Sequence, residues 1–115
     1  MKFMLLIHGN EEAMNNATQV DSAGMSPEYA AYNEALVKAG AMLGGERLRP
    51  TTAAACVRVR NGKTEVLDGP YAETKEQFGG YYIIEAADFD AAMGWAQQCP
   101  AAHFGTIEVR PVIQG

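Results

Sequence analysis

Residues 2–8 read KFMLLIH, and residues 80–86 read GYYIIEA. In residues 2–8, apolar side chains stand at the odd positions, Phe3, Leu5 and Ile7, and also at the even positions Met4 and Leu6. Residues 80–86 likewise have apolar side chains at both odd and even positions. A strand covered on one face alternates apolar with polar residues, whereas a strand buried on both faces reads as a continuous apolar run. The sequence therefore predicts two central strands, and the rest of the fold is worked out from them.

Two helices are predicted beside these strands from their end signals. Ser26 suits an N-cap, Pro27 the first helical position and Gly40 a left-handed end, while Asp88 and Pro100 delimit a second helix. Each segment carries an apolar stripe at helical spacing, which predicts an amphipathic helix. The stripe residues are Tyr29, Tyr32, Leu36 and Val37 in the first helix and Phe89, Ala92, Met93 and Ala96 in the second.

Residues 55–67 predict a β-hairpin. Asn61-Gly62 lies between two alternating runs, and this dipeptide is typical of a two-residue turn. Counting outward from the turn, Val57 faces Val66, and Arg58 on the opposite face of the hairpin meets Glu65. One face of the hairpin is therefore expected to be apolar and the other to carry an ion pair.

The order of elements predicts the fold class. Residues 41–48 and 104–113 supply two further strands, and 9–25 are expected to form a loop. Strand, helix, strand, hairpin, strand, helix and strand give a single α+β domain over 1–115, with a ferredoxin-like βαββαβ plan, an added hairpin, an antiparallel sheet and both helices on one sheet face. Nothing in the chain is left to cover the other face, so we expect a homodimer that packs sheet against sheet.

Composition excludes several classes of function. Nine basic and fourteen acidic residues give a net charge of −5, which argues against binding to nucleic acid or to an anionic membrane surface. No apolar run is long enough for a signal peptide or a spanning helix. Cys56 and Cys99 fit no CxxC pattern, and we expect both to be buried small hydrophobes in a cytoplasmic protein. No cofactor and no metal site are expected.

The passage VLDGPYAETKEQFGGYYIIEA, with MKFMLLIHG before it and CPAAHFGTIEVRPV after it, resembles the YCII-related family in its DGPF-type subgroup. Tyr71 stands where that subgroup usually has Phe. The resemblance implies a dimeric α+β barrel. It also implies two kinds of function, because some relatives look like enzymes with a His and Asp acid/base pair, one of them a dehydrochlorinase acting on a hydroxyquinol, while others accompany extracytoplasmic-function sigma factors.

The resemblance gives Tyr29 a place in the candidate site. Enzyme-like relatives carry the His of that pair after a Pro near the start of the first helix, and here SPEY puts Tyr29 at this position. A phenol titrates near ~10 and an imidazole near ~6.5, so Tyr29 is suited to donate a hydrogen bond or a proton and is a poor base at neutral pH.

Asp68 is the first candidate for catalysis in the segment 68–80. An aspartate that follows a strand commonly accepts the N–H two residues on, but that residue is Pro70, which has none. The carboxylate must then reach the Tyr71 N–H, another segment, water or a ligand. Asp68 therefore either holds a turn or serves a site.

Other residues accompany Asp68 in the candidate site. Tyr71, Glu73 and Lys75 are expected to contact a ligand from the same segment, with solvated surface charge as the alternative for the charged ones. His8 ends the first central strand on the face of Met4 and Leu6, where it is either a hydrogen-bonded rim residue or an acid/base group. Two functions follow: a small-molecule site with acid/base, isomerase- or lyase-like chemistry on a small ring compound, or a non-catalytic regulatory protein associated with a sigma factor.

Overall fold

The computed structural model describes residues 1–12 and 26–113. Its elements in chain order are β1 (Lys2–Gly9), α2 (Pro27–Lys38), β2 (Met42–Arg47), η1 (Thr51–Ala53), β3 (Ala55–Arg60), β4 (Lys63–Asp68), β5 (Gln77–Glu85), α3 (Phe89–Gln98), η2 (Pro100–His103) and β6 (Thr106–Pro111). The loop expected over 9–25 falls for the most part on 13–25, outside the described residues.

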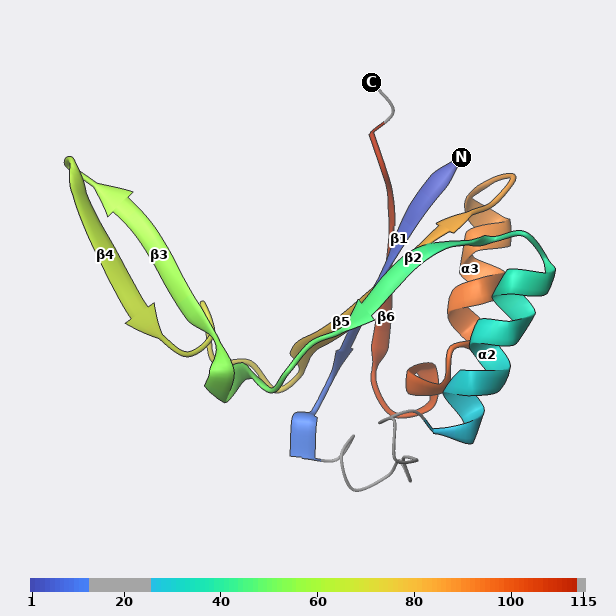
Figure 1. The fold of residues 1–115 in the computed structure, drawn as a ribbon, viewed down its shortest axis with the longest axis horizontal. Coiled ribbons are helices and arrows are strands. Elements are labelled where there is room, and N and C mark those ends of the chain that lie inside the picture. Colours follow the sequence, from blue (N-terminus) through green and yellow to red (C-terminus); the bar gives the residue numbers. More distant parts are fainter. Residues whose placement is uncertain (13–25, 114–115) are drawn as a thin grey trace.

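Four strands form an antiparallel sheet in the order β2-β5-β1-β6 (Figure 1). The two strands with apolar residues on both faces, β1 and β5, are the central pair, as predicted. This order is that of the ferredoxin-like plan. The α+β class is therefore confirmed, with β3 and β4 forming the added two-stranded sheet.

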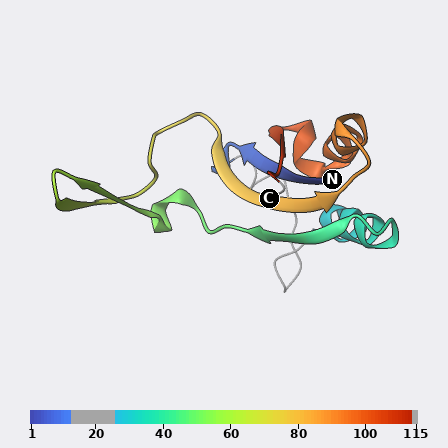
Figure 2. The same cartoon turned by 90° about the horizontal axis from the view of Figure 1, so that it is seen from above.

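The two faces of the four-stranded sheet differ in cover. Along β1 the side chains of Phe3, Leu5 and Ile7 are buried, and those of Met4 and Leu6, on the opposite face, are partly exposed. The buried set packs against both helices, which lie on the same side of the sheet (Figures 1 and 2). The core consists of Phe3, Leu5, Ile7, Tyr32, Leu36, Ala41, Tyr82, Ile84, Ala86, Ala92, Ala96, Cys99 and Ala101.

The helix ends follow the sequence signals. Ser26 Oγ accepts the N–H of Tyr29 at 3.2 Å, Asp88 Oδ1 accepts the N–H of Ala91 at 2.8 Å, and Gly40 has a φ of 69°. The apolar stripe of α2 is narrower than expected, because Val37 is 63% exposed. One residue advances a helix by about 100°, so when Leu36 points at the sheet its neighbour points away from it.

The hairpin has the expected register. Val57 pairs with Val66 and Arg58 with Glu65, and both turn residues have positive φ, 53° at Asn61 and 76° at Gly62, as a type I′ turn requires.

The strand after the hairpin begins earlier than predicted. β5 starts at Gln77 because Gln77 and Phe78 pair with the end of β1. The connector between β4 and β5 therefore covers residues 69–76 and is shorter than the segment 68–80 discussed above.

In the part of the chain that the structure describes, the helices are too short to cross a bilayer.

The burial of α2 gives a test of the core. Leu36 is fully buried and Val37 is mostly exposed, so Leu36→Ala should lower the free energy of unfolding by about 2–5 kcal/mol, whereas Val37→Ala should change it by no more than about 0.5 kcal/mol. Urea denaturation followed by circular dichroism measures both. Equal losses in the two variants would contradict this orientation of α2.

Candidate functional site

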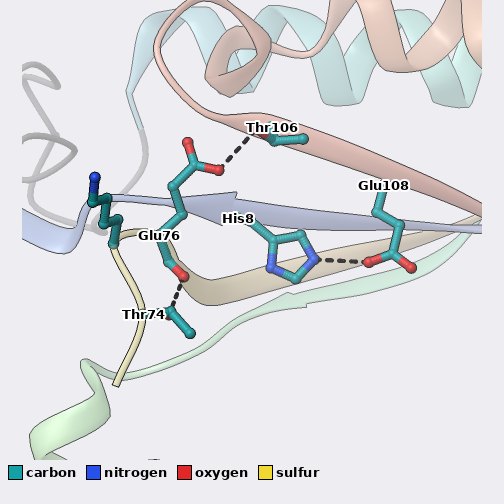
Figure 3. A pocket seen from close by; sticks show the side chains of 6 residues that line it. His8, Thr74, Glu76, Thr106 and Glu108 are labelled. Atoms are coloured by element: carbon teal, nitrogen blue, oxygen red, sulfur yellow. Dashed lines mark hydrogen bonds and ion pairs between the residues drawn. The ribbon is translucent and has the colours of Figure 1, made fainter. Parts of the chain in front are cut away.

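A cavity of about 510 Å³ lies at one end of the sheet, where β1 ends and β5 and β6 begin. It opens on the face that the helices leave uncovered, and His8, Thr74, Lys75, Glu76, Thr106 and Glu108 line it (Figure 3). Three separate parts of the chain supply these residues: the end of β1, the connector before β5, and β6.

Strand alternation and close packing place His8 in this cavity. His8 follows Met4 and Leu6 on the uncovered face, and it pairs with Phe78 of β5 and Thr106 of β6. The rings of His8 and Phe78 lie 5.5 Å apart between centroids. Gly105, just before β6, packs so tightly on the His8 carbonyl oxygen that a Cβ there would collide with it.

An acid–imidazole pair lines the cavity. His8 Nε2 is 3.0 Å from Glu108 Oε1, and the two side chains point toward each other (Figure 3). The other carboxylate oxygen, Glu108 Oε2, is 3.6 Å from Nε of Arg110. When the imidazole is neutral with its proton on Nε2, the carboxylate holds that tautomer and leaves Nδ1 as a proton acceptor.

The connector supplies the second half of the cavity. Thr106 Oγ1 donates to Glu76 Oε1 at 2.8 Å, which ties the connector to β6, and the Thr74 hydroxyl donates to the backbone oxygen of Glu76 (Figure 3). Lys75 also lines the cavity, and within residues 1–12 and 26–113 its ammonium group has no hydrogen-bond or ion-pair partner. The cavity thus combines a proton acceptor, two carboxylates and an available cation.

A second cavity, of about 530 Å³, lies between α2 and η2, and Tyr29, Tyr32 and His103 are among its lining residues. Beneath it the Tyr29 hydroxyl is 3.8 Å from Cys99 Sγ, and the Tyr32 hydroxyl donates to the Trp95 carbonyl at 2.7 Å. Burial, reinforced by the neighbouring Cys99, raises the pKa of the Tyr29 phenol. Tyr29 therefore stays protonated at neutral pH and can act as a donor.

The same burial acts on the neighbours of Tyr29. It raises the pKa of the Tyr32 and Tyr82 phenols and of the Cys99 thiol, in each case as the largest cause. A thiol that holds its proton is a poor nucleophile. This cluster is therefore suited to packing and to hydrogen-bond donation.

The residues singled out from the sequence are distributed over three places. His8 and Lys75 line the first cavity and Tyr29 the second, whereas Asp68, Tyr71 and Glu73 line neither. Tyr71 is 88% exposed.

Asp68 ends β4, opposite Ala55. Its carboxylate makes no hydrogen bond or ion pair with the described residues, and the N–H of the next residue, Gly69, donates to the Ala54 carbonyl at 2.7 Å, one pair beyond Ala55 and Asp68 in the hairpin. Among the described residues, the Asp68 side chain therefore makes no contact that would hold a turn.

Glu108 and Thr106 were not found from the sequence. Alternation along the last strand does put Glu108 and Arg110 on the face opposite Ile107 and Val109. That Glu108 meets His8, a hundred positions earlier, depends on the register of β1 with β6, which alternation does not fix. Across the described ranges, no three His, Cys, Asp or Glu side chains gather into a group that could hold a metal ion.

The raised pKa values predict how stability depends on pH. The folded chain keeps the protons of Tyr29 and Cys99 to higher pH than the unfolded chain does, so the free energy of unfolding should fall as the pH rises above the ordinary values of about 8.5 for a thiol and 10 for a phenol. Urea titrations from pH 7.5 to about pH 10.5 measure this fall. Tyr29→Phe should make it shallower, and Tyr71→Phe, at an exposed position, should leave it unchanged.

Stability that does not decrease over this range would contradict the buried, protonated cluster. An equal effect of the two tyrosine variants would contradict the role given to Tyr29.

Comparison with known proteins identifies the family. The YCII-related domain matches residues 1–114. An uncharacterized protein of Rhizobium meliloti (strain 1021) is 36% identical over 114 residues, a match that covers 97% of this chain and 92% of that protein. Matches of this length span every element described above. The chain belongs to the YCII-related family.

Proposed function

We propose that this protein binds a small molecule in the cavity at His8 and transfers a proton there, in an isomerase- or lyase-like step on a small ring compound. The observation that carries the proposal is the 3.0 Å contact between His8 Nε2 and Glu108 Oε1 in an open cavity. An imidazole oriented by a carboxylate, within reach of solvent and ligand, is the group that most often performs acid/base chemistry near neutral pH.

Each lining residue has a role in this proposal. Glu108 holds the imidazole, so that Nδ1 of His8 accepts a proton from a carbon or hydroxyl of the ligand and later returns it. Lys75, which has no partner within the described residues, binds the negative oxygen that develops when the proton leaves. The bond from Thr106 to Glu76 keeps the connector, and with it Lys75, beside the cavity.

Asp68, Tyr71 and Glu73 remain candidates for ligand contact in this proposal, although they lie outside the cavity. The lack of a hydrogen bond at Asp68 within the described residues supports a ligand role over a role in holding the turn. We also infer, from DGPY at 68–71, that the chain belongs to the DGPF-type subgroup of its family.

The uncovered sheet face supports a homodimer. Met4, Leu6, Tyr81 and Ile83 form its apolar centre and are only partly exposed in one chain. A second copy that packs on this face would bury that apolar centre. It would also bring the surface of the partner chain toward the His8 cavity, which opens on the same face. Two free thiols, Cys56 and Cys99, support the reducing environment of the cytoplasm as the location.

The alternative is a regulatory protein that binds a metabolite without turning it over, in association with an extracytoplasmic-function sigma factor. The phenol at position 29 favours it, because a protonated tyrosine stands where the enzyme-like relatives carry a His base, and burial raises its pKa further. This function predicts ligand binding with no chemical change in the ligand.

A ligand screen tests the proposal. Small ring compounds with an acidic C–H or a hydroxyl group are screened by thermal shift, because a ligand that binds the native state raises the melting temperature. For a hit that is converted, His8→Gln should retain binding and lower kcat by about 100-fold or more, since the amide can form the hydrogen bond to Glu108 but cannot take a proton. Glu108→Gln should also lower kcat.

His103→Gln is the matched control, because His103 lines the second cavity and should leave turnover unchanged. Asp68→Asn should leave the melting temperature unchanged and weaken binding of the hit. Turnover that survives in His8→Gln and is lost in His103→Gln would move the site to the second cavity. Binding with no conversion of any hit would favour the regulatory function.

A further inference from the structure

The side-chain amide of Gln77, the first residue of β5, bonds to two separate segments of the chain. Its Oε1 accepts the backbone N–H of Glu11 at 2.9 Å, and its Nε2 donates to the Thr74 carbonyl at 2.6 Å. Glu11 follows the end of β1, and Thr74 belongs to the connector between β4 and β5. Gln77 therefore joins the end of the strand that carries His8 to the connector that carries Lys75.

The connector bends at Lys75 and Glu76, immediately before β5. Across the described residues, no backbone hydrogen bond joins Thr74 to Gln77 over this bend. Two side chains close it instead, because Gln77 donates to the Thr74 carbonyl and the Thr74 hydroxyl donates to the Glu76 carbonyl (Figure 3). The direction in which the chain presents Lys75 therefore depends on side-chain bonds that a substitution can remove.

This bend is anchored on both sides. On one side Glu76 Oε1 accepts the Thr106 hydroxyl of β6 at 2.8 Å, and on the other Gln77 ties the bend to the end of β1. Lys75 lies between the two anchors and lines the cavity. A lysine side chain is long and flexible, so the anchors fix the point from which it extends and thus the region that its ammonium group can reach.

The two partners of Gln77 explain why a glutamine suits this position. One partner is a hydrogen-bond donor and the other an acceptor, and a primary amide offers both functions. A carboxylate of the same length only accepts, an ammonium group only donates, and a thioether donates nothing and accepts weakly. Gln77 is also partly buried and pairs with Gly9 in the sheet, so its side chain starts from a fixed backbone.

We propose that Gln77 is a positioning residue of the His8 cavity, which holds the bend of the connector so that the Lys75 ammonium group reaches the negative oxygen that develops on the ligand. This inference rests on the function proposed above and adds a residue that does not itself line the cavity. A displacement of about 1 Å at a group that acts on the reacting atoms can lower a rate by about 100-fold, so loss of the bond to Thr74 should affect turnover.

Trypsin tests the bend without a ligand, because it cleaves after Lys75 only when the connector opens. Gln77→Met should raise this rate in the native protein by about fivefold or more, the effect of one lost hydrogen bond, and should change cleavage after Lys38, at the end of α2, by less than about twofold. Each rate is divided by that of a synthetic peptide of the same sequence. Gln98→Met is the matched control, because the Gln98 amide donates to the Gly94 carbonyl within α3, and it should leave both rates unchanged.

A double-mutant cycle asks whether Gln77 acts through Lys75. With a ligand that the wild type converts, Gln77→Met should lower kcat by about tenfold or more, but by less than about twofold in a chain that already carries Lys75→Met. The pH dependence of kcat should keep its shape, because His8 and Glu108 are unchanged. Gln98→Met should leave kcat unchanged.

The outcomes separate this inference from the function on which it rests. Unchanged cleavage after Lys75 in Gln77→Met, or an equal rise at Lys38, overturns the hold on the bend and leaves the His8 site standing. An equal loss of kcat in both backgrounds overturns the action through Lys75.

Two further results act on the proposed function itself. Full turnover in Lys75→Met removes the role given to Lys75, and this inference with it, and leaves His8 and Glu108 in place. Conversion of no ligand overturns the proposed chemistry and the part of Gln77 in it, and the trypsin rates then decide separately whether Gln77 holds the bend.

Discussion

A sheet has two faces, and this chain supplies helices for one of them. Phe3, Leu5 and Ile7 are buried beneath α2 and α3, while Met4 and Leu6 of the same strand point away from both helices. Apolar side chains on both faces are the reason that β1 occupies the centre of the sheet, and they also leave an apolar surface that the described helices do not cover. The proposals for assembly and for the site both derive from this imbalance.

The side of the sheet without helices also carries the features that suggest function. The imbalance places His8 on the uncovered face, and Glu108 comes from the neighbouring strand on the same face. The hairpin of β3 and β4 extends on that side as well (Figure 1). A ligand in the His8 cavity and a second copy on the sheet would therefore be neighbours, so that binding at one surface would affect the other. The helix side, by contrast, contains buried phenols and a thiol whose raised pKa values suit them to a protonated, stable core.

Much of the fold could be predicted from local signals. The runs 2–8 and 80–86 gave the central pair, Asn61-Gly62 gave the turn and register of the hairpin, and Ser26 and Asp88 gave the helix starts, because each signal acts within a few residues. The predictions that were wrong depended on tertiary contacts. Val37 extends the helical pattern but turns away from the sheet, and β5 begins at Gln77 because its first residues pair with β1.

The candidate site was harder to predict from the sequence than the fold was. His8 could be assigned to the face of Met4 and Leu6 by alternation, but its partner Glu108 depends on the register of two strands at opposite ends of the chain. In the connector, the sequence favoured Asp68, whereas Lys75 and Glu76 line the cavity. Side chains in an irregular segment have no period from which their direction can be read, so chemistry alone could not rank them.

The most direct test of this account is the solution mass of the chain. Sedimentation velocity at low micromolar concentration should give twice the chain mass of 12.4 kDa for the wild type. Leu6→Lys, which places a charge in the centre of the uncovered face and leaves the helix-covered core intact, should give the mass of one folded chain. A wild type that sediments as a single, stably folded chain would contradict the claim that a second copy covers this face.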